Sequence, residues 1–512
     1  MKMNYTLLAI IALLFHACGN RVESNVAETD APRLVSTSPK DGADGITAAF
    51  LSVVFTYDQI IKSPLEARQR VSVDGGAAVE KVEVHAKDLT VSLTGLTRGS
   101  RYTLSLPEGT VRGFKHNQKG SAAVQFHFST REPDPVSPDP EGWEKAAVAV
   151  VNMGVGWNLG NTLDANSGGV DNMWIEAFTD RTPADYEKAW GQPLATRELI
   201  HLFKEAGFGA IRVPVTWYPH MGSVNVTVID NHGHWDMSTW NGFDVDPAWM
   251  ARVKEVVSYV LDEGMYCILN VHHDTGDAST AWLRADPTAY ASARERYCAL
   301  WKQIAAAFEP YGPRLVFESF NEMLDAKGTW NASTDAAHEI INRYNADFVA
   351  TVRETGGNNT WRNLILNTYA ASTHPEVLRS FRLPADAAEG HLMAEVHSYA
   401  PYHFAFDGTF APKTVFDEAA EKEVKDIVEN MNTYLVSKGI PCILGEYGCT
   451  SSRAETEMAK QAACYISAAA KYNIPCFYWM GLSDGNDRTV PKWTKPILKD
   501  AILKAYLDSK GH

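Results

Sequence analysis

Two glutamates stand directly after apolar runs that are typical of buried strands. Glu322 ends the run Leu315-Val-Phe-Glu-Ser-Phe-Asn-Glu322, and Glu446 follows the run Ile440-Pro-Cys-Ile-Leu-Gly445. A pair of carboxyl groups, one protonated and one ionised, can cleave a glycosidic bond by acid/base and nucleophilic chemistry. A single glutamate at a strand end is more often structural, so the hypothesis depends on the pair and on its neighbours.

Strands alternate with amphipathic helices from Trp143 onward, and this alternation must position the two glutamates. The predicted strands lie near Gly154–Leu159, Ala210–Pro214, Tyr266–His272, Leu315–Asn321, Leu364–Asn367, Leu392–His397, Cys442–Glu446 and Cys476–Met480. Eight strand–helix repeats predict an α/β fold, a (β/α)8 TIM barrel over residues 143–512. Such a barrel carries its chemistry at the C-terminal strand ends. The candidate residues there are Asn161, Arg212, His272, Asn321, Glu322, His397, Tyr399, Glu446 and Trp479.

Residues 32–131 have a different pattern, with short alternating runs separated by turn signals. Ser52–Tyr57 and Arg101–Leu106 are two such runs, and Asp74-Gly75-Gly76 is one of the turns. Period-2 alternation with frequent turns predicts an all-β sandwich, and the opening Ser38–Ile46 resembles bacterial immunoglobulin-like domains. A spacer role is expected for this domain, with glycan binding as the alternative. Four prolines in Arg131–Pro140 predict a stiff linker over residues 132–142.

The N-terminus has the pattern of an export signal. Lys2 precedes the apolar stretch Leu7–Phe15, which is too short to span a bilayer core of ~30 Å as a helix. The sequence His16-Ala17-Cys18-Gly19 resembles the end of a bacterial lipoprotein leader. Residues 1–17 are therefore expected to be a lipoprotein signal peptide, Cys18 the lipidated residue, and 18–31 a flexible tether. A plain secretory signal peptide is the alternative. Either the cell surface or the periplasm fits this extracytoplasmic, membrane-anchored location.

Composition limits the partners. The net charge of −15, from 62 acidic and 47 basic residues, argues against nucleic acid, whose binding requires neutralisation of phosphates. Outside the leader, the sequence contains six cysteines that lack the spacing of metal ligands: Cys267, Cys298, Cys442, Cys449, Cys464 and Cys476. They are expected to be buried free thiols, with a disulfide as the alternative. The membrane is expected to be contacted through the lipid anchor only, and the protein to be a monomer.

Seven motifs in order resemble glycoside hydrolase family 5, the cellulase-type retaining hydrolases. They are Gly156–Ala165, Ile211–Pro214, Asn270–Asp274, Phe320–Glu322, His397–Tyr399, Gly445–Gly448 and Phe477–Trp479. The resemblance covers residues 143 to 507. It implies a (β/α)8 barrel in which Glu322 is the general acid/base and Glu446 the nucleophile. Met323 and Tyr447 depart from the family's usual proline and phenylalanine, which puts the substrate in doubt more than the mechanism.

The chemistry requires neighbours that keep the two glutamates in opposite protonation states. Arg212 and Tyr399 are expected to donate hydrogen bonds to Glu446 and keep it ionised. His397 is expected to orient Glu322 or the substrate. Asn321 is expected to bind the 2-hydroxyl of the sugar.

Further residues are expected to contact the sugar itself. Trp479 would stack on the sugar next to the cleavage point, since a pyranose has an apolar face. Asn161 would bond a sugar hydroxyl. In the family's pattern His272 bonds substrate or catalytic groups, and His273 lines the glycone side. The long loop Trp217–Asp246 is expected either to form a cleft wall or to pack its aromatic residues onto the barrel.

Some polar residues near these motifs are expected to have ordinary roles. His272-His273-Asp274 suggests a metal site, but a catalytic metal requires three or four ligands in suitable geometry, and no His-x-His at the first strand accompanies this pair. No metal or other cofactor is therefore expected. Glu318 has the strand parity of Glu322 and should point into the barrel. Asp164 and Asp274 are expected to be solvated loop acids.

The leading hypothesis is an endo-β-1,4-glucanase that cuts a polysaccharide by double displacement. Xyloglucan, mixed-linkage glucan and β-mannan are alternative substrates on the same scaffold. A non-catalytic glycan-binding surface protein is a separate hypothesis, which the presence of both glutamates disfavours.

Overall fold

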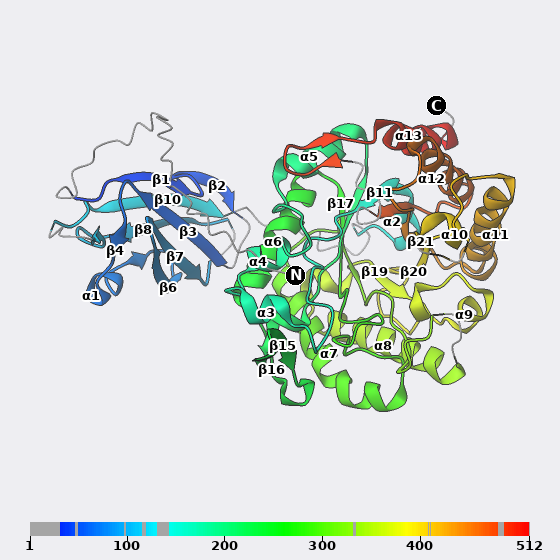
Figure 1. Ribbon diagram of the computed structural model, residues 1–512, viewed down its shortest axis with the longest axis horizontal. Helices are drawn as coiled ribbons and strands as arrows, with labels where there is room; N and C mark the ends of the chain where they lie inside the picture. Colours follow the sequence, from blue (N-terminus) through cyan, green and yellow to red (C-terminus); the bar gives the residue numbers. More distant parts are fainter. Residues whose placement is uncertain are drawn as a thin grey trace, which may run out of the picture. The chain divides into compact units, whose positions relative to one another are not determined.

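The computed structural model describes residues 31–46, 50–96, 99–114, 119–130, 143–330, 334–407, 409, 411–479 and 486–510. The chain forms two compact units, an N-terminal β unit and a larger α/β unit (Figure 1). The expected leader, the expected tether up to residue 30 and the expected linker over 132–142 lie outside the described residues.

The N-terminal unit is a sandwich of two four-stranded sheets. One sheet has the order β1-β3-β7-β6, with strands Leu34–Ser38, Phe50–Tyr57, Asp88–Thr94 and Ala78–His85. The other has the order β2-β10-β8-β5, with strands Ala43–Ile46, Val124–Thr130, Arg101–Leu106 and Ser72–Val73. Alternate residues such as Leu89, Val91 and Leu93 are buried, as the period-2 pattern predicts. The short helix α1 (Leu65–Arg68) and the pair β4 (Ile61–Lys62) and β9 (Arg112–Gly113) complete this unit.

The larger unit contains the predicted barrel, closed by parallel pairing of its first and last strands. Its strands in order are β11 (Val155–Asn158), β12 (Ala210–Val213), β17 (Tyr266–Asn270), β18 (Leu315–Glu318), β19 (Leu364–Asn367), β20 (Leu392–Ser398), β21 (Cys442–Tyr447) and β22 (Cys476–Trp479). Each lies within one or a few residues of its predicted range. All eight are buried along their length, as expected for strands covered by helices.

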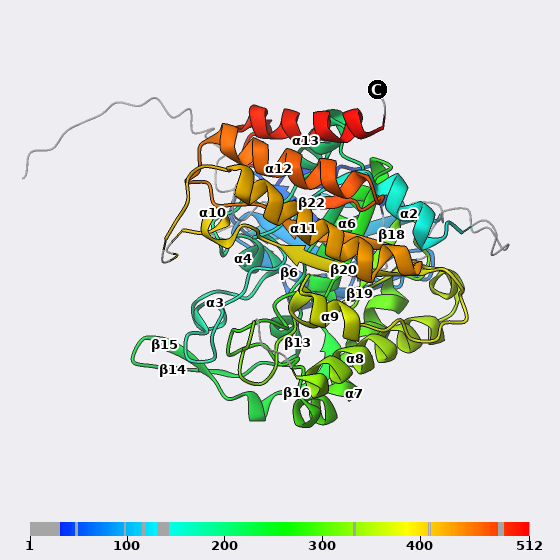
Figure 2. The ribbon, with the colours of Figure 1, turned by 90° about the vertical axis from the view of Figure 1, so that its right-hand side faces the viewer.

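Helices surround the barrel strands, and side-chain caps mark where several of them begin. Thr196 accepts a hydrogen bond from Leu199 N at the start of α5, and Asp246 and Asp286 cap α6 and α7 in the same manner. The larger helices are α5 (Arg197–Ala206), α6 (Pro247–Asp262), α7 (Pro287–Phe308), α8 (Asp335–Glu354), α11 (Glu418–Tyr434), α12 (Glu455–Ala470) and α13 (Pro496–Ser509). Helix α12 packs between α11 and α13 (Figure 2). The sequence patterns did not predict α13.

Shorter helices and strands occupy the segments between these elements. The helices are α2 (Ala146–Met153), α3 (Trp174–Phe178), α4 (Pro183–Glu187), α9 (Pro375–Ser380) and α10 (Tyr402–Ala405). A two-stranded sheet near the C-terminus pairs β23 (Asn486–Asp487) with β24 (Lys492–Trp493).

The long loop after β12 folds into two small antiparallel pairs. Strand β13 (Met221–Ser223) pairs with β16 (Asn241–Val245), and β14 (Val226–Ile229) pairs with β15 (His232–Trp235). Trp217 and Trp235 are buried, and Trp217 Nε1 donates to the carbonyl of Asn270 at 2.9 Å. These two aromatic residues therefore pack the loop onto the barrel, which was one of the two predicted roles.

The six cysteines of the described residues are free thiols, four buried and two partly buried. This agrees with the preferred interpretation of the sequence. Every helix in the described part of the chain is too short or too polar to cross a membrane.

Candidate active site

Arg212 is the centre of a buried polar cluster at the C-terminal end of β12. Its guanidinium binds both carboxylate oxygens of Glu318, at 2.6 and 2.8 Å, and donates to Glu446 Oε1 at 2.7 Å. It also donates to Asn158 and Asn321, at 3.0 and 2.9 Å. Arg212 and Glu318 are fully buried, so these charge-assisted contacts fix the guanidinium rigidly. The prediction that Glu318 points into the barrel is confirmed.

A bulge in β21 directs Glu446 toward this cluster. Val396 is opposite Leu444 and His397 is opposite Glu446, so Gly445 is an extra residue in β21. The carbonyl of Gly445 accepts a hydrogen bond from Asn158 Nδ2 at 2.9 Å. At this position Glu446 Oε1 accepts a hydrogen bond from Arg212, and Glu446 Oε2 accepts one from the Tyr399 hydroxyl at 2.6 Å. Both expected contacts of Glu446 are present.

Glu322 lies beside Glu446, and His397 lies between them. His397 Nδ1 is 2.9 Å from Glu322 Oε1 and 3.7 Å from Glu446 Oε2. Glu322, His397 and Glu446 each offer an atom within 4.8 Å of the others. Carboxyl groups this close suit a direct attack on the sugar, because a mechanism with a water between them needs about 6.5–9.5 Å.

The surroundings give the charged groups different pKa values. Burial alone would raise the pKa of Glu446, but His397, Arg212 and the Tyr399 hydrogen bond together lower it below its ordinary value. Burial likewise would lower the pKa of His397, yet Glu446 and the hydrogen bonds to Glu322 and Glu395 raise it to about 10. Glu446 is thus an anion beside an imidazolium at neutral pH, and it has the ionised form that a nucleophile requires.

Trp479, His272 and His273 line the same hollow as the two glutamates. The Trp479 indole is stacked on the His272 ring, with centroids 5.6 Å apart and planes 3° apart. His272 Nε2 is 4.0 Å from Glu446 Oε1, and burial lowers the pKa of His272 well below its usual value. Asn270 Nδ2 donates to His272 Nδ1 at 3.0 Å, so a neutral His272 carries its proton on Nε2 and can donate one hydrogen bond at the sugar site.

Asn161 is not among the residues that line this hollow. Its backbone N–H donates to Asp164 Oδ2 at 3.0 Å, and its φ of 56° is in the left-handed region that asparagine tolerates. Its expected contact with a sugar hydroxyl stays a prediction.

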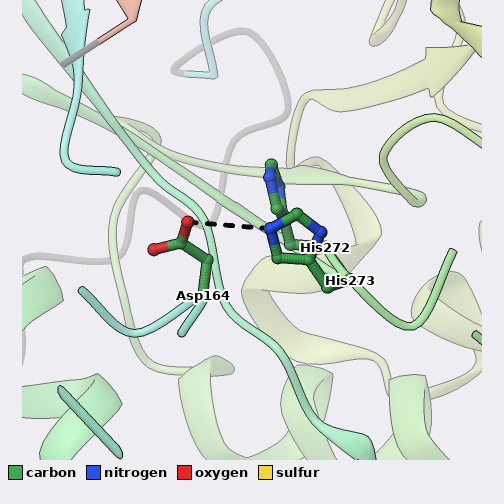
Figure 3. A group of neighbouring side chains, drawn as sticks. All are labelled: Asp164, His272 and His273. Carbon is green, nitrogen blue, oxygen red and sulfur yellow. Dashed lines mark ion pairs between the residues drawn. The ribbon is translucent and has the colours of Figure 1, made fainter. Parts of the chain in front are cut away.

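Asp164 and Asp274 contradict the expectation that they are solvated loop acids, because both are completely buried. Asp274 accepts hydrogen bonds from the backbone N–H groups of Trp217 and Tyr218 and from Trp282 Nε1. Asp164 accepts from Thr162 N and lies 3.9 Å from His273 Nε2 (Figure 3). These carboxyl groups hold loops at the rim of the barrel, a role that strand patterns do not reveal.

The hollow that contains the glutamates has a volume of about 750 Å³. Beyond the expected residues it is lined by Trp330, Tyr402 and Phe406, from the loops after β18 and β20. Trp330 and Tyr402 are 42% and 61% exposed, so their rings are open to a bound chain. Sequence reasoning missed them because they follow irregular loops and no strand parity locates them.

Within the part of the chain that the structure describes, two groups of side chains have a spacing that would permit a metal ion. One is Asp164, His272 and His273 (Figure 3), and the other is Glu322, His397 and Glu446. The second group already forms the hydrogen bonds described above, and its two carboxyl groups are the candidates for acid and nucleophile. An ion there would compete with the substrate for the same atoms.

Comparisons with known proteins agree with this geometry. Residues 171–484 match the model of the cellulase family, glycosyl hydrolase family 5, and residues 28–130 match a bacterial Ig-like domain. Endoglucanase A of Clostridium longisporum is 31% identical over 400 residues, which cover 75% of this chain and 70% of that protein. Endoglucanase B of Ruminococcus albus is 35% identical over 384 residues, covering 72% and 83% of the two chains.

Solved structures are similar as well. A family 5 enzyme from Prevotella bryantii, in complex with a xyloglucan tetradecasaccharide, is 40% identical with a TM-score of 0.62. The match covers 71% of this chain and 99% of that one. A broad specificity endoglucanase from Ruminococcus champanellensis with bound cellotriose is 34% identical, with a TM-score of 0.62 and coverage of 70% and 98%. The chain therefore belongs to glycoside hydrolase family 5, with a bacterial immunoglobulin-like domain before its catalytic barrel.

Proposed function

We propose that this glycoside hydrolase is an endo-β-1,4-glucanase in which Glu446 is the nucleophile and Glu322 the general acid/base. The observation that carries the proposal is the pair itself, two carboxyl groups within 4.8 Å in an open hollow, one of them bound by Arg212 and Tyr399. This arrangement suits retaining hydrolysis, in which the acid starts protonated and uncharged while the nucleophile starts ionised.

The reaction proceeds in two displacements. Glu322 gives its proton to the glycosidic oxygen while a Glu446 oxygen attacks the anomeric carbon, so the leaving chain departs and a glycosyl ester forms on Glu446. Glu322, now ionised, then takes a proton from water, and the resulting hydroxide equivalent displaces Glu446. Arg212 holds the Oδ1 of Asn321, which leaves the amide N–H groups of Asn321 to bind the sugar 2-hydroxyl. Trp479 lines the hollow, and the sugar ring stacks on its indole.

The substrate is a β-1,4-linked glucan chain. Relatives named endoglucanases support this assignment. Xyloglucan is the second candidate, because a structure 40% identical to this chain holds a xyloglucan oligosaccharide. Mixed-linkage glucan and β-mannan follow, and one structure 39% identical to this chain is described as an endo-β-mannanase/endo-β-glucanase. The protein needs no organic cofactor for either step and works as a monomer.

A panel of polysaccharides tests the assignment. We expect the full chain to release reducing ends from carboxymethylcellulose, mixed-linkage glucan and xyloglucan, and to leave xylan intact. Viscosity should fall well before much sugar is released, because an endo-acting enzyme cuts inside the chain. Cleavage of mannan alone would be consistent with the proposed mechanism but would contradict the proposed substrate. No cleavage of any member would favour the glycan-binding hypothesis.

Tyr399→Phe is expected to lower kcat about 10- to 100-fold, since a hydrogen bond to a charged group contributes about 1.5–3 kcal/mol. The lost hydrogen bond also helps to lower the pKa of Glu446. Without it that pKa rises, so the acidic limb of the pH profile of kcat/KM should move to higher pH. The matched control is Tyr402→Phe, which removes a hydroxyl from the same hollow and should leave the acidic limb in place. An unshifted limb in Tyr399→Phe would contradict the role.

The chain is also proposed to be exported and anchored by a lipid on Cys18, on the cell surface or in the periplasm. The support for this is the leader pattern of residues 1–19. Metabolic labelling with a fatty-acid analogue tests it, because Cys18→Ala should abolish the label and release the protein from the membrane fraction. In this arrangement the immunoglobulin-like domain is a spacer between the membrane and the barrel.

A further inference from the structure

Glu395 is a buried carboxyl group that the two displacement steps do not use. It lies on β20 two residues before His397, and both side chains point into the barrel. Glu395 Oε1 is 3.1 Å from His397 Nε2 and 3.2 Å from Arg212 Nε. His397 is therefore held at both ring nitrogens, by Glu395 on one side and by Glu322 on the other.

The backbone next to Glu395 leaves room for it at one position. Gly445, the extra residue of the β21 bulge, faces the Glu395 carboxyl group, and a Cβ atom there would overlap that group. The bulge thus has two effects, since it aims Glu446 at the sugar and opens the space that Glu395 fills. A carboxyl group placed so closely against a backbone has little freedom to turn, which makes it a firm support for His397.

The charges around Glu395 favour its uncharged form. The cluster contains two cations, Arg212 and His397, and Glu318 and Glu446 already balance them. Burial and the charge of Glu318 raise the pKa of Glu395 to about 8, although Arg212 opposes this. Among the described residues, Glu395 Oε2 has no hydrogen-bond partner, and an unpaired buried oxygen is less costly on a neutral group than on an anion.

We propose that Glu395 is a positioning residue, which accepts the Nε2–H of His397 as an uncharged carboxyl group and so holds Nδ1 against Glu322. The inference rests on the proposed function, because it concerns how the acid/base group is kept in place. An imidazolium donates from both nitrogens, so a rotated ring would lose both acceptors. Loss of a hydrogen bond from a charged donor such as this imidazolium costs about 10- to 100-fold in activity.

The test compares two variants on two substrates at pH 6. Glu395→Leu removes the acceptor of the His397 hydrogen bond, so kcat on mixed-linkage glucan should fall about 10- to 100-fold with KM within about two-fold of the wild-type value. Glu395→Gln keeps an uncharged acceptor and should restore kcat to within about three-fold of the wild type. Should the leucine variant not fold, Glu395→Met, which is unbranched, replaces it.

The second substrate is dinitrophenyl β-cellobioside, whose phenolate leaves without a proton. Its kcat/KM reports the first displacement and does not depend on Glu322 as an acid. We therefore expect Glu395→Leu to keep this value within about three-fold while it loses activity on the glucan. Equal losses on both substrates, or a normal rate on the glucan, would overturn the proposal. A glutamine variant as poor as the leucine variant would overturn it too.

Glu187→Gln is the control for stability. Glu187 is a fully buried carboxylate paired with Arg252 at 2.8 Å, on helices outside the barrel. Loss of this carboxylate should lower the melting temperature, and any loss of activity should be equal on the two substrates. A wild-type enzyme that cuts neither substrate would instead contradict the proposed function, so the two failures are distinguishable.

Discussion

Glu446→Ala is expected to lose on the order of 10⁴- to 10⁶-fold in kcat on β-glucan and to regain turnover when azide is added. The alanine leaves a space where the nucleophile stood, and a small anion can occupy it beside Arg212 and Tyr399, which normally bind the carboxylate. Azide then attacks the anomeric carbon once. Because a single displacement inverts the configuration, the product should be the α-glycosyl azide, which NMR identifies.

The matched control is Glu176→Ala, which removes another buried glutamate of the same unit, one that is hydrogen-bonded to Ser167. Any loss of activity in that variant comes from stability, so azide should not change it. If Glu446→Ala gives the β-glycosyl azide, the two glutamates have the opposite roles, with Glu446 as the acid/base. Normal hydrolysis by the same variant would remove Glu446 from the mechanism.

The barrel could be predicted from the sequence because each of its strands is a buried, apolar run followed by polar residues. Glu318 and Asn270 illustrate how far parity extends, since both point into the barrel as their strand positions require. Arg212, His397 and Glu446 lie on barrel strands, and Asn321, Glu322 and Tyr399 follow β18 and β20, so all six meet at the C-terminal end of the barrel. The strand pattern therefore located these residues at the end of the barrel, and the family resemblance implied the roles of Glu322 and Glu446.

The loops could not be predicted in this manner. Asp164 and Asp274 have the composition of solvated loop residues, yet they are buried because backbone N–H groups of the surrounding loops turn toward them. Trp330 lies on a loop, and Tyr402 begins the short helix α10 in the segment after β20, so neither belongs to a barrel strand whose position the sequence pattern predicts. The bulge at Gly445 also has no periodic signal, since it shifts the register by one residue between Leu444 and Glu446.

Glu395 falls between these two cases. Its parity with His397 was visible in the sequence and predicts an inward side chain. Its importance was not visible, because the contact with His397 and the space opposite Gly445 depend on the register of β20 and β21. A strand position thus shows where a side chain points, while its function requires the neighbouring strand as well.

Glu322→Ala is expected to lose about 10²- to 10⁴-fold in kcat/KM on β-glucan and to keep near-normal kcat/KM on dinitrophenyl β-cellobioside. The glucan leaving group is a sugar hydroxyl that must be protonated as it departs, whereas the phenolate needs no proton. Glu446 keeps its contacts with Arg212 and Tyr399, so the first displacement on the activated substrate proceeds.

The second displacement in Glu322→Ala lacks its base, so the glycosyl ester on Glu446 should accumulate and be visible by mass spectrometry of the intact protein. Azide needs no base, and its attack on this ester is the second inversion, so the product should be the β-glycosyl azide. The two alanine variants are therefore expected to give glycosyl azides of opposite anomeric configuration. If Glu322→Ala yields the α-anomer, or loses both substrates equally, Glu322 is not the acid/base, and the arrangement of His397 around it has another purpose.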